Sequence, residues 1–401
     1  MHIGIAGPIA IGPIRELLPA NRSLPALYSF PLIGVLAREL HDLGHTLSLF
    51  SLSTEVASPI LIETDRIKLH ILPRRKRGDA YDFFQKERRH LAQAMRDSNC
   101  ELVHAHWTYE FAAAAQESGK PSLITAHDSP LVVCRYYLRT KAILYWTMRS
   151  MLGLNVVRNA KFLTAVSPYV EDHLRYVCSS GADLVTIPNG VNESLFSRGR
   201  CRLDGPEIKS PFTMACVLEG FGLRKNAQTA IEAFQILKER HPDIRLRLYG
   251  VDFGPGERAQ AWASSQGSLD GLEFIGKVSQ DRLFSDLTGE THLLLHPSLE
   301  EAHPMALCES MALGLSILGG SKSGGVPFTL DNGKAGFLCD MRNPAAVVSS
   351  IQQILSSPEE VKKRAEHAWH FANREFTSSR MTSRYLEAYT RVLARTDLFA
   401  S

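Results

Sequence analysis

The sequence has no hydrophobic run long enough to cross a bilayer, and its first residues lack the basic leader and apolar stretch of a signal peptide. Its seven cysteines are scattered, with no Cys-x-x-Cys pair and no His/Cys spacing typical of a metal site. These absences argue against a membrane-spanning chain, a disulfide-stapled secreted domain and a zinc ribbon. We therefore expect a cytoplasmic protein whose thiols stay reduced.

The net charge is also small, because the sequence has 45 Lys and Arg residues and 42 Asp and Glu residues, for a formal net charge of +3. Such a balance gives no global attraction for nucleic acid, so an anionic ligand must be met by local clusters. The sequence contains no Asp-x-Asp motif. We therefore expect neither a nucleic-acid partner nor a bound divalent metal.

The chain of 401 residues is too long for one ordinary core and alternates short apolar runs with helical patterns. This alternation predicts an α/β fold of two Rossmann-like, doubly wound domains that face each other across a cleft. A polar stretch at 192–210 separates them, so the predicted boundary lies between residues 200 and 201. The predicted strands are 1–7, 46–51, 67–72, 102–105, 122–125, 162–166 and 185–187, then 212–217, 244–249, 272–275, 292–296 and 316–318.

The most informative stretch is a strand that runs into a proline-containing loop and then a helix. Pro304 suits the first helical turn, so the free amides of Met305 and Ala306 could meet an anion such as a diphosphate. Glu309, about one turn further along, could accept hydrogen bonds from neighbouring ribose hydroxyls, and Glu301 precedes the helix, closer to a sugar. Taken singly, Glu309 is better explained as a solvated helix residue and Glu301 as a carboxylate that caps the helix.

Two further places carry residues suited to chemistry. Arg224 and Lys225 open the helix after the first strand of the second domain, where paired cations could neutralise a departing nucleoside diphosphate. His127 and Asp128 follow the strand at 122–125, at the end of the sheet where catalytic groups of open sheets collect. A solvated basic helix start and a histidine held by a neighbouring carboxylate are the structural alternatives.

The motif Pro-Ser-x-x-Glu, followed after seven residues by Glu-x-Met-Ala-x-Gly, runs here from Pro297 to Gly314 and resembles the signature of glycosyltransferase family 4, the group 1 retaining glycosyltransferases. Other landmarks similar to the family's recur in order at Gly44-His45, Val103-His104-Ala105-His106, Ala126-His127-Asp128, Ala165-Val166-Ser167, Ile187-Pro188-Asn189-Gly190-Val191, Gly276-Lys277-Val278 and Gly324-Gly325-Val326-Pro327. The resemblance therefore covers almost the entire chain.

This resemblance implies the glycosyltransferase B fold, with an N-terminal acceptor domain, a C-terminal nucleotide-sugar donor domain at 201–377 and a last helix, about 378–401, that completes the first domain. It implies that Glu309 holds the donor ribose, that Glu301 and His127 contact the donor sugar, and that the backbone near Val278 contacts the base. The residues with implied catalytic roles are His127, Lys225 and Glu301. Those with implied substrate-binding roles are Arg224, Val278, Glu301, Met305, Ala306 and Glu309.

The implied activity is a metal-independent, retaining transfer of a hexose from a nucleotide-diphospho-sugar to a glycan or lipid-linked acceptor, without a cofactor, in surface polysaccharide or glycolipid synthesis. Three departures from the family pattern bear on it. Gly220 stands where an Arg usually precedes the phosphate Lys by five residues, Phe328 replaces a Glu, and the usual Phe-Gly-Leu is here His303-Pro304-Met305. A degenerate nucleotide-sugar or polysaccharide binder is therefore the alternative, ahead of an epimerase or phosphorylase of the same architecture.

Basic and aromatic residues interleave between Asp128 and Glu171, a stretch without any acidic residue. Such a stretch could lie on an anionic membrane beside a lipid-linked acceptor, peripheral to the inner face of the membrane, or it could be a helix packed on the sheet with solvated arginines. The run from Arg74 to Arg77 adds to the basic character.

Overall fold

The computed structural model describes residues 1–20, 23–27, 30–76, 78–179, 181–205 and 211–400, so Arg77 and the end of the polar stretch at 206–210 lie outside it. The chain forms two compact units: unit 1 comprises Met1–Gly190 and Ser378–Ser401, and unit 2 comprises Val191–Thr377. The predicted boundary at 200/201 falls later than the structural one. The reason is that α7 (Ser194–Asp204) packs against helices of unit 2.

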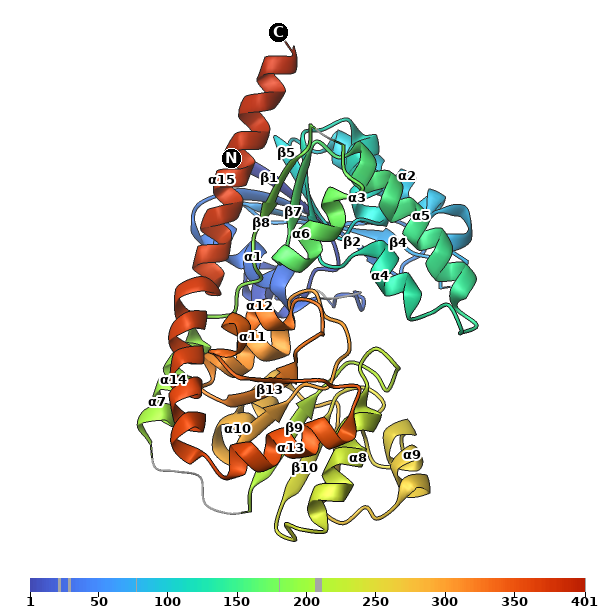
Figure 1. Ribbon diagram of the computed structural model, residues 1–401. Coiled ribbons are helices and arrows are strands. Elements are labelled where there is room, and N and C mark those ends of the chain that lie inside the picture. The colour runs from blue at the N-terminus through green and yellow to red at the C-terminus, as the bar shows by residue number, and fades with distance from the viewer. Residues whose placement is uncertain (21–22, 28–29, 77, 180, 206–210, 401) are drawn as a thin grey trace. The chain divides into compact units, whose positions relative to one another are not determined.

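Unit 1 is built on an eight-stranded sheet in the order β3-β4-β2-β1-β5-β6-β7-β8 (Figure 1). Its strands are β1 (His2–Ala6), β2 (Thr46–Ser53), β3 (Ile60–Glu63), β4 (Ile67–Pro73), β5 (Leu102–His106), β6 (Ser122–Ala126), β7 (Phe162–Ala165) and β8 (Asp183–Thr186). β3 runs antiparallel to β4, whereas the other neighbours pair in parallel. The sequence pattern missed β3 because this edge strand buries only Ile62.

Helices cover the sheet of unit 1, and the C-terminal helix is one of them. They are α1 (Pro31–Asp42), α2 (Gln85–Asp97), α3 (Glu110–Ser118), α4 (Pro130–Arg135), α5 (Ile143–Asn159), α6 (Pro168–Arg175) and α15 (Ser378–Ala400), with short 3₁₀ turns η1 (Gly12–Leu17) and η2 (Ala80–Asp82). α3 packs against α2 and α5, and α15 packs against α1, β5 and β6. Tyr385 and Tyr389 of α15 are fully buried, which holds this distant segment within unit 1.

Unit 2 contains a six-stranded parallel sheet in the order β11-β10-β9-β12-β13-β14. Its strands are β9 (Thr213–Val217), β10 (Arg245–Tyr249), β11 (Leu272–Gly276), β12 (Leu293–Leu295), β13 (Ser316–Gly320) and β14 (Phe337–Cys339). β14 has three residues, too few for an alternation to reveal it in the sequence.

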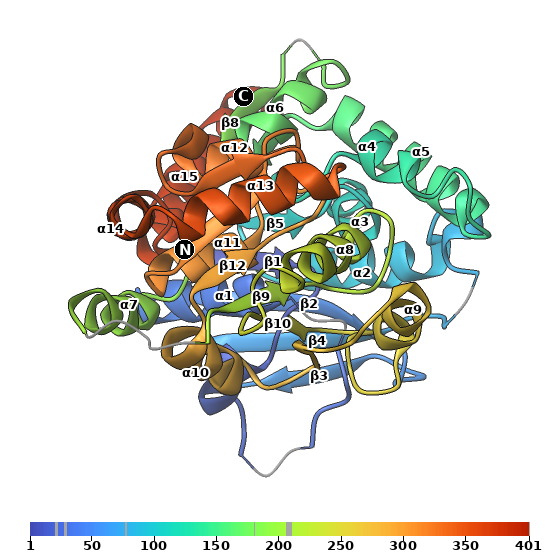
Figure 2. The same cartoon turned by 60° about the horizontal axis from the view of Figure 1, so that its bottom comes forward.

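Helices lie on both faces of this second sheet, as the alternating side chains of its strands require. They are α7, α8 (Ala227–Lys238), α9 (Arg258–Gln266), α10 (Gln280–Glu290), α11 (Met305–Ala312), α12 (Val326–Thr329), α13 (Pro344–Leu355) and α14 (Pro358–Glu375), with a 3₁₀ turn η3 (Asp331–Gly333). Met214 and Cys216 of β9 enter the core that α8 and α13 cover, whereas Ala215 enters the core that α11 and α14 cover. α8 and α13 pack against each other, as Figure 2 shows. Both units are therefore doubly wound α/β structures, which confirms the predicted fold class.

The strand order of unit 2 places two distant loops beside each other. β9 pairs directly with β12, although a long stretch of chain separates them. From β9 the chain continues to β10 on one side, whereas β12 and β13 lie on the other side, so the order reverses at this pair. Ligands of open α/β sheets bind outside the carboxyl ends of the strands at such a reversal. The loops after β9 and β12 are therefore where a site is expected.

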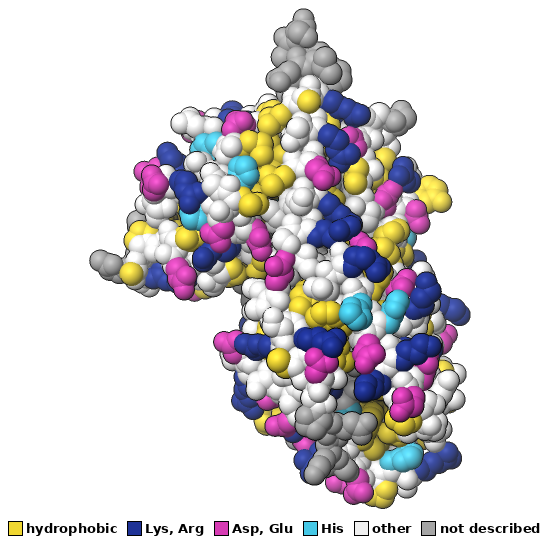
Figure 3. Space-filling model, turned by 90° about the vertical axis from the view of Figure 1, so that its left-hand side faces the viewer, with side chains coloured by type: hydrophobic (Ala, Val, Ile, Leu, Met, Phe, Trp, Pro, Cys, Tyr) yellow, Lys and Arg dark blue, Asp and Glu magenta, His cyan; other side chains and the backbone are white. Residues whose placement is uncertain are grey.

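Among the described residues, none of the helices combines the length and the apolar character needed to cross a membrane. Acidic and basic side chains are interspersed over the face drawn in Figure 3, in keeping with the nearly balanced charge of the sequence.

Candidate active site

In unit 2, hydrogen bonds connect the loop that follows β9 to the loop that follows β12. One joins two backbone groups, and others come from an asparagine side chain. The Leu299 amide donates to the Arg224 carbonyl at 2.8 Å. The Asn226 side chain donates to the carbonyls of Pro297 and Met341 at 3.1 and 2.7 Å. Asn226 has a φ of 54°, a left-handed conformation that asparagine tolerates better than most residues. These bonds fix the side chains on the two loops relative to each other.

The two connected loops bring Arg224 and Lys225 against two buried carboxylates. Lys225 Nζ lies 2.5 Å from Glu301 Oε1, and Arg224 Nη1 lies 3.4 Å from Glu300 Oε2 and 3.9 Å from Glu301 Oε2. Burial alone would raise the pKa of Glu301, but the Lys225 ammonium, the nearby His296 imidazole and the Arg224 charge hold that pKa well below its usual value. Glu301 is therefore ionised and held by cations at neutral pH.

His296 belongs to the same cluster, although the sequence analysis did not select it. It follows β12, is buried, and places Nε2 3.4 Å from Glu301 Oε1. A backbone hydrogen bond also fixes the position of Glu301, since the Gly325 amide donates to the Glu301 carbonyl at 2.7 Å. A histidine at the carboxyl end of a buried strand is the sequence signal that could have found it.

The first turn of α11 offers free amide groups beside this cluster. Pro304 occupies the N-cap position with extended backbone, one residue before the predicted place, and its carbonyl accepts the amides of Leu307 and Cys308 at 3.1 and 3.2 Å. The amides of Met305 and Ala306 donate to no acceptor among the residues that the structure describes. Two unpaired donors at the positive end of a helix form a natural anion site.

Glu309 lies one turn further along α11 and is half-buried. Its carboxylate has no hydrogen bond or ion pair within the described parts of the chain. Burial therefore raises its pKa from 4.5 to about 7. An unpaired carboxylate in partly dry surroundings can accept hydrogen bonds from a ligand's hydroxyl groups, which is the interaction predicted for this residue.

Val278 follows β11, two strands away from β9 in the sheet. It is half-buried and packs against the hydrophobic core on the α11 side of the sheet. Strands are spaced by about 4.8 Å, so Val278 lies roughly 10 Å along the sheet edge from the loop that carries Lys225. The structure thus groups Lys225, Arg224 and Glu301 closely and sets Val278 apart from them.

In unit 1, His127 follows β6 and is buried among aromatic rings. His106 Nδ1 lies 2.9 Å from His127 Nε2, so one imidazole donates to the other, and the Trp107 ring centroid is 4.5 Å from that of His127. Asp128 accepts a hydrogen bond from the Tyr109 hydroxyl at 2.9 Å. His106 belongs to one of the landmarks noted in the sequence, and the structure makes it the direct partner of His127.

Burial lowers the pKa of His127 to about 3, so its imidazole is neutral at ordinary pH. Its Nδ1 atom is buried and has no partner among the described residues. His104 differs from it, because its two ring nitrogens lie 2.8 Å from the Tyr389 hydroxyl and 2.7 Å from the Thr125 hydroxyl. His104 is therefore a structural residue, whereas His127 keeps one nitrogen available for a ligand.

Comparison with known proteins connects both units to one family. The family model "Glycosyl transferases group 1" matches residues 206–370, and the model "Glycosyltransferase Family 4" matches residues 33–195. The chain belongs to glycosyltransferase family 4. This confirms the resemblance inferred from the Pro297–Gly314 motif.

Curated relatives of this glycosyltransferase are distant. It is 23% identical over 320 residues to N-acetyl-alpha-D-glucosaminyl L-malate synthase of Bacillus anthracis, covering 76% of this chain and 78% of that protein. It is 28% identical over 159 residues to D-inositol 3-phosphate glycosyltransferase of Streptomyces griseus subsp. griseus, covering 37% of this chain and 33% of that one.

Solved structures similar to the glycosyltransferase confirm the glycosyltransferase B fold. Sucrose-phosphate synthase from Thermosynechococcus elongatus matches with a TM-score of 0.77 at 17% identity, covering 98% of this chain and 99% of that one. Anabaena HepE in complex with UDP-glucose matches with a TM-score of 0.67 at 14% identity, covering 98% and 100% of the two chains. At these identities the likeness concerns the fold alone.

The departures from the family pattern have local structural causes in this glycosyltransferase. Gly220 has a φ of 87°, a left-handed conformation that would strain the arginine expected there. The next amide, that of Phe221, donates to Asp252 at 3.0 Å, which holds the turn. Phe328 lies in an aromatic cluster, with ring centroids 5.8 Å from His303 and 6.2 Å from Phe376. An apolar contact therefore replaces a carboxylate.

Within the described residues, no group of three or more His, Cys, Asp or Glu side chains is arranged to hold a metal ion. The cations next to the candidate anion site of the glycosyltransferase are Lys225 and Arg224, whose side chains are 15% and 30% exposed. These two side chains and the amides of α11 are groups at this site that could neutralise a bound anion.

Proposed function

We propose that this glycosyltransferase is a retaining, metal-independent hexosyltransferase that uses a nucleotide-diphospho-sugar donor and a glycan or lipid-linked acceptor, in surface polysaccharide or glycolipid synthesis. The observation that carries the proposal is the grouping of Lys225 and Glu301 on the two connected loops, next to the unpaired amides that open α11 and to the unpaired Glu309. A cation, an anion site and hydroxyl acceptors are the groups that a nucleotide sugar needs.

In this proposal the donor diphosphate binds the amides of Met305 and Ala306 and the cations of Lys225 and Arg224. Glu309 accepts hydrogen bonds from the ribose hydroxyls, as acidic residues do in dinucleotide sites. Glu301 accepts hydrogen bonds from hydroxyls of the donor sugar, and Val278 marks the loop whose backbone meets the base. His127 of unit 1 supplies its free ring nitrogen to the donor sugar.

The reaction breaks the bond between the anomeric carbon and the diphosphate oxygen, and the bonding electrons leave with the diphosphate. An acceptor hydroxyl oxygen forms the new bond on the same face of the sugar, and its proton passes to the departing phosphate oxygen. Lys225 and the helix amides stabilise the negative charge that develops there. The low pKa of His127 makes it a neutral hydrogen-bonding group in this step, not a general acid.

The second candidate is a degenerate protein that binds nucleotide sugar without transferring it. It is favoured by Gly220 and Phe328, which remove a cation and a carboxylate that the family pattern carries. Both candidates bind nucleotide, but only the enzyme turns over a donor, so turnover distinguishes them.

We also propose that the protein is cytoplasmic and associates with the membrane through α4, α5 and the segment between them. Leu138 and Leu144 there are 59% and 57% exposed, beside Arg139 and the exposed Lys141. Exposed leucines next to cations suit the interface of an anionic bilayer.

The experiment that tests the proposed function is a thermal-shift screen with UDP, GDP, ADP and TDP in the presence of EDTA, for wild type, Glu309→Ala and the control Glu239→Ala. Glu239 is an exposed carboxylate of the same unit. We expect one nucleotide to raise Tm in wild type and in the control but not in Glu309→Ala. The matching nucleotide sugar should then be turned over, with the product's anomeric configuration read by NMR. Absence of a shift with every nucleotide would contradict the donor site.

A further inference from the structure

A second concave site lies in unit 1, outside the carboxyl ends of β2 and β4. The cavity has a volume of about 790 Å³, which is within the range of small-molecule sites. Its lining includes Thr54 just after β2, Arg74, Arg75 and Lys76 just after β4, and Tyr145 and Arg149 on α5. Of the described lining residues, four are cationic and one, Asp79, is acidic.

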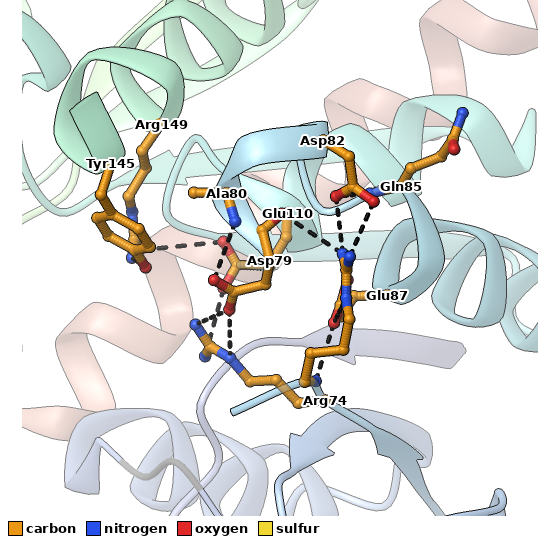
Figure 4. A network of polar contacts seen from close by, with 10 residues as sticks. Arg74, Asp79, Ala80, Asp82, Gln85, Glu87, Glu110, Tyr145 and Arg149 are labelled. Carbon is orange, nitrogen blue, oxygen red and sulfur yellow. Dashed lines mark hydrogen bonds and ion pairs between the residues drawn. The ribbon is translucent and has the colours of Figure 1, made fainter. Parts of the chain in front are cut away.

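Carboxylates behind the lining hold two of the arginines in place. Arg74 pairs with Asp79 at 3.0 Å, and Figure 4 shows these two side chains meeting next to Glu110. Arg75 pairs with Asp82 and Glu87, each at 2.7 Å. Except for Asp79, these carboxylates do not line the cavity, so the guanidinium groups are positioned by anions but face an anion-poor surface.

Arg149 reaches the cavity from the other side and is only 12% exposed. Its guanidinium lies 4.1 Å from the centroid of the Tyr109 ring, with Glu110 4.0 Å away. Its Nε atom is buried and has no hydrogen-bond partner among the described residues. A buried guanidinium that is incompletely paired costs stability, and an anion bound in the cavity would complete its surroundings.

Lys76 is the exposed cation of the cavity. No ion pair or side-chain hydrogen bond involves it within the described parts of the chain. An unpaired ammonium beside three held guanidinium groups raises the positive potential inside the cavity without neutralising any carboxylate.

The backbone beside the cavity is held in an uncommon conformation. Phe83 and Phe84 have φ values of 54° and 58°, in the left-handed region that bulky side chains rarely adopt. The centroid of the buried Phe84 ring lies 5.9 Å from the guanidinium carbon of Arg74 and 5.9 Å from that of Arg149. Strain of this kind persists where the surroundings fix a residue, and it is concentrated at ligand sites.

The cavity is connected to His127 within unit 1. Arg149 covers the ring of Tyr109, and the hydroxyl of that tyrosine donates to Asp128, the neighbour of His127. Both places lie at the carboxyl edge of one sheet, the cavity at β2 and β4 and His127 at β6. A molecule that binds the cavity can therefore extend along the same edge towards His127.

We propose that this cavity binds the phosphate group of the sugar acceptor, so that the enzyme selects acceptors that carry a phosphate. The inference rests on the proposed transferase function. Planar guanidinium groups match phosphate oxygens in pairs, and three of them with one ammonium suit a dianionic phosphate monoester better than a single carboxylate. The phosphate is carried either by a soluble acceptor or by a lipid, and these sources share the same recognition chemistry.

The test compares two phosphate monoesters, sn-glycerol 3-phosphate in solution and phosphatidic acid in phosphatidylcholine vesicles. Binding is measured by calorimetry and by vesicle co-sedimentation for wild type, Lys76→Glu, Arg149→Met and the control Lys161→Glu. Lys161 is exposed in the same unit, does not line the cavity and lies outside the segment proposed to meet the membrane. Lys76 is exposed, so its variant keeps the fold even where Arg149→Met fails the check by circular dichroism.

We expect wild type and Lys161→Glu to bind glycerol 3-phosphate with the same affinity. Lys76→Glu should bind it about tenfold more weakly, because the loss of one charge-assisted hydrogen bond weakens binding by about that factor. Recruitment to phosphatidic acid vesicles that glycerol 3-phosphate abolishes identifies a lipid acceptor, whereas binding of the soluble ester alone identifies a soluble one. Either result supports the cavity.

Failure of wild type to bind either probe would overturn the inference, as would equal binding by wild type and Lys76→Glu. Binding of the nucleotide found in the screen, measured on the same samples, is the separate test of the proposed function, since the donor residues Lys225, Glu301 and Glu309 lie in unit 2. Loss of phosphate binding with nucleotide binding intact would concern the cavity alone.

Discussion

Replacing Glu309 by glutamine should raise the free energy of unfolding at neutral and alkaline pH. The same change should weaken the affinity of the protein for a nucleotide. Burial raises the pKa of this carboxyl from 4.5 to about 7, because no cation among the described residues compensates for the lost water. The proton-linked stability is therefore fully present below pH 4.5 and is lost as pH rises through 7. Glutamine keeps the shape and cannot ionise.

The size of the gain follows from the pKa shift. A difference of about 2.5 pKa units at about 1.4 kcal/mol each gives at most about 3.5 kcal/mol well above pH 7, and the water that reaches this half-buried group reduces this value. One kcal/mol corresponds to about 2–4 °C in Tm for a unit of this size. We expect the variant to unfold several degrees higher than wild type at pH 8 and at the same temperature near pH 4.5.

Differential scanning fluorimetry from pH 4.5 to 8.5, with and without the nucleotide found in the screen, measures both effects. Glu239→Gln is the matched control, because it makes the same change at an exposed position of unit 2. A Tm difference between Glu309→Gln and wild type that does not change with pH would refute the reasoning, as would full nucleotide affinity in the variant.

Three further expectations concern single positions. Lys225→Ala should cost about 3 kcal/mol in a denaturant titration, because it leaves a buried carboxylate without its partner at 2.5 Å. It should also lower turnover more than donor binding, whereas Lys362→Ala, at an exposed position of the same unit, should change neither. Gly220→Ala should cost about 1 kcal/mol because of the φ of 87°, and Gly222→Ala, in open space, should cost little; equal costs would contradict the assignment. Burial lowers the pKa of His127 to about 3, so its contribution to the free energy of unfolding is present above pH 6.5 and is lost as pH falls towards 3. His127→Gln should therefore make the free energy of unfolding fall less steeply as the solution is acidified. An unchanged pH profile of unfolding would contradict this prediction.

The sequence pattern was sufficient for the strands that are buried on both faces. β5, β6 and β9 read as apolar runs because helices cover them on both sides, and their predicted positions agree closely with the structure. The pattern failed for β3 and β14, which are short and lie at sheet edges. At an edge, pairing with one neighbour defines the strand, and such pairing leaves little mark on the local sequence.

Motif spacing selected Glu301, Glu309 and Lys225, but it could not show which of them are paired. Glu301 is held by Lys225, whereas Glu309 has no partner in the described chain, and this difference gives the two carboxylates opposite pKa shifts. Both lie near the start of one helix, so only the loop brought in by β9 distinguishes them.

The sequence by itself determined the alternating α/β architecture, the family and the identity of the motif residues, because these depend on local periodicity and on short-range spacing. Only the tertiary structure decided that His296 joins Glu301, that His106 pairs with His127, and that arginines from β4 and α5 line one cavity. Each of these groupings depends on long-range strand pairing and helix packing, which bring distant residues together and remove them from water.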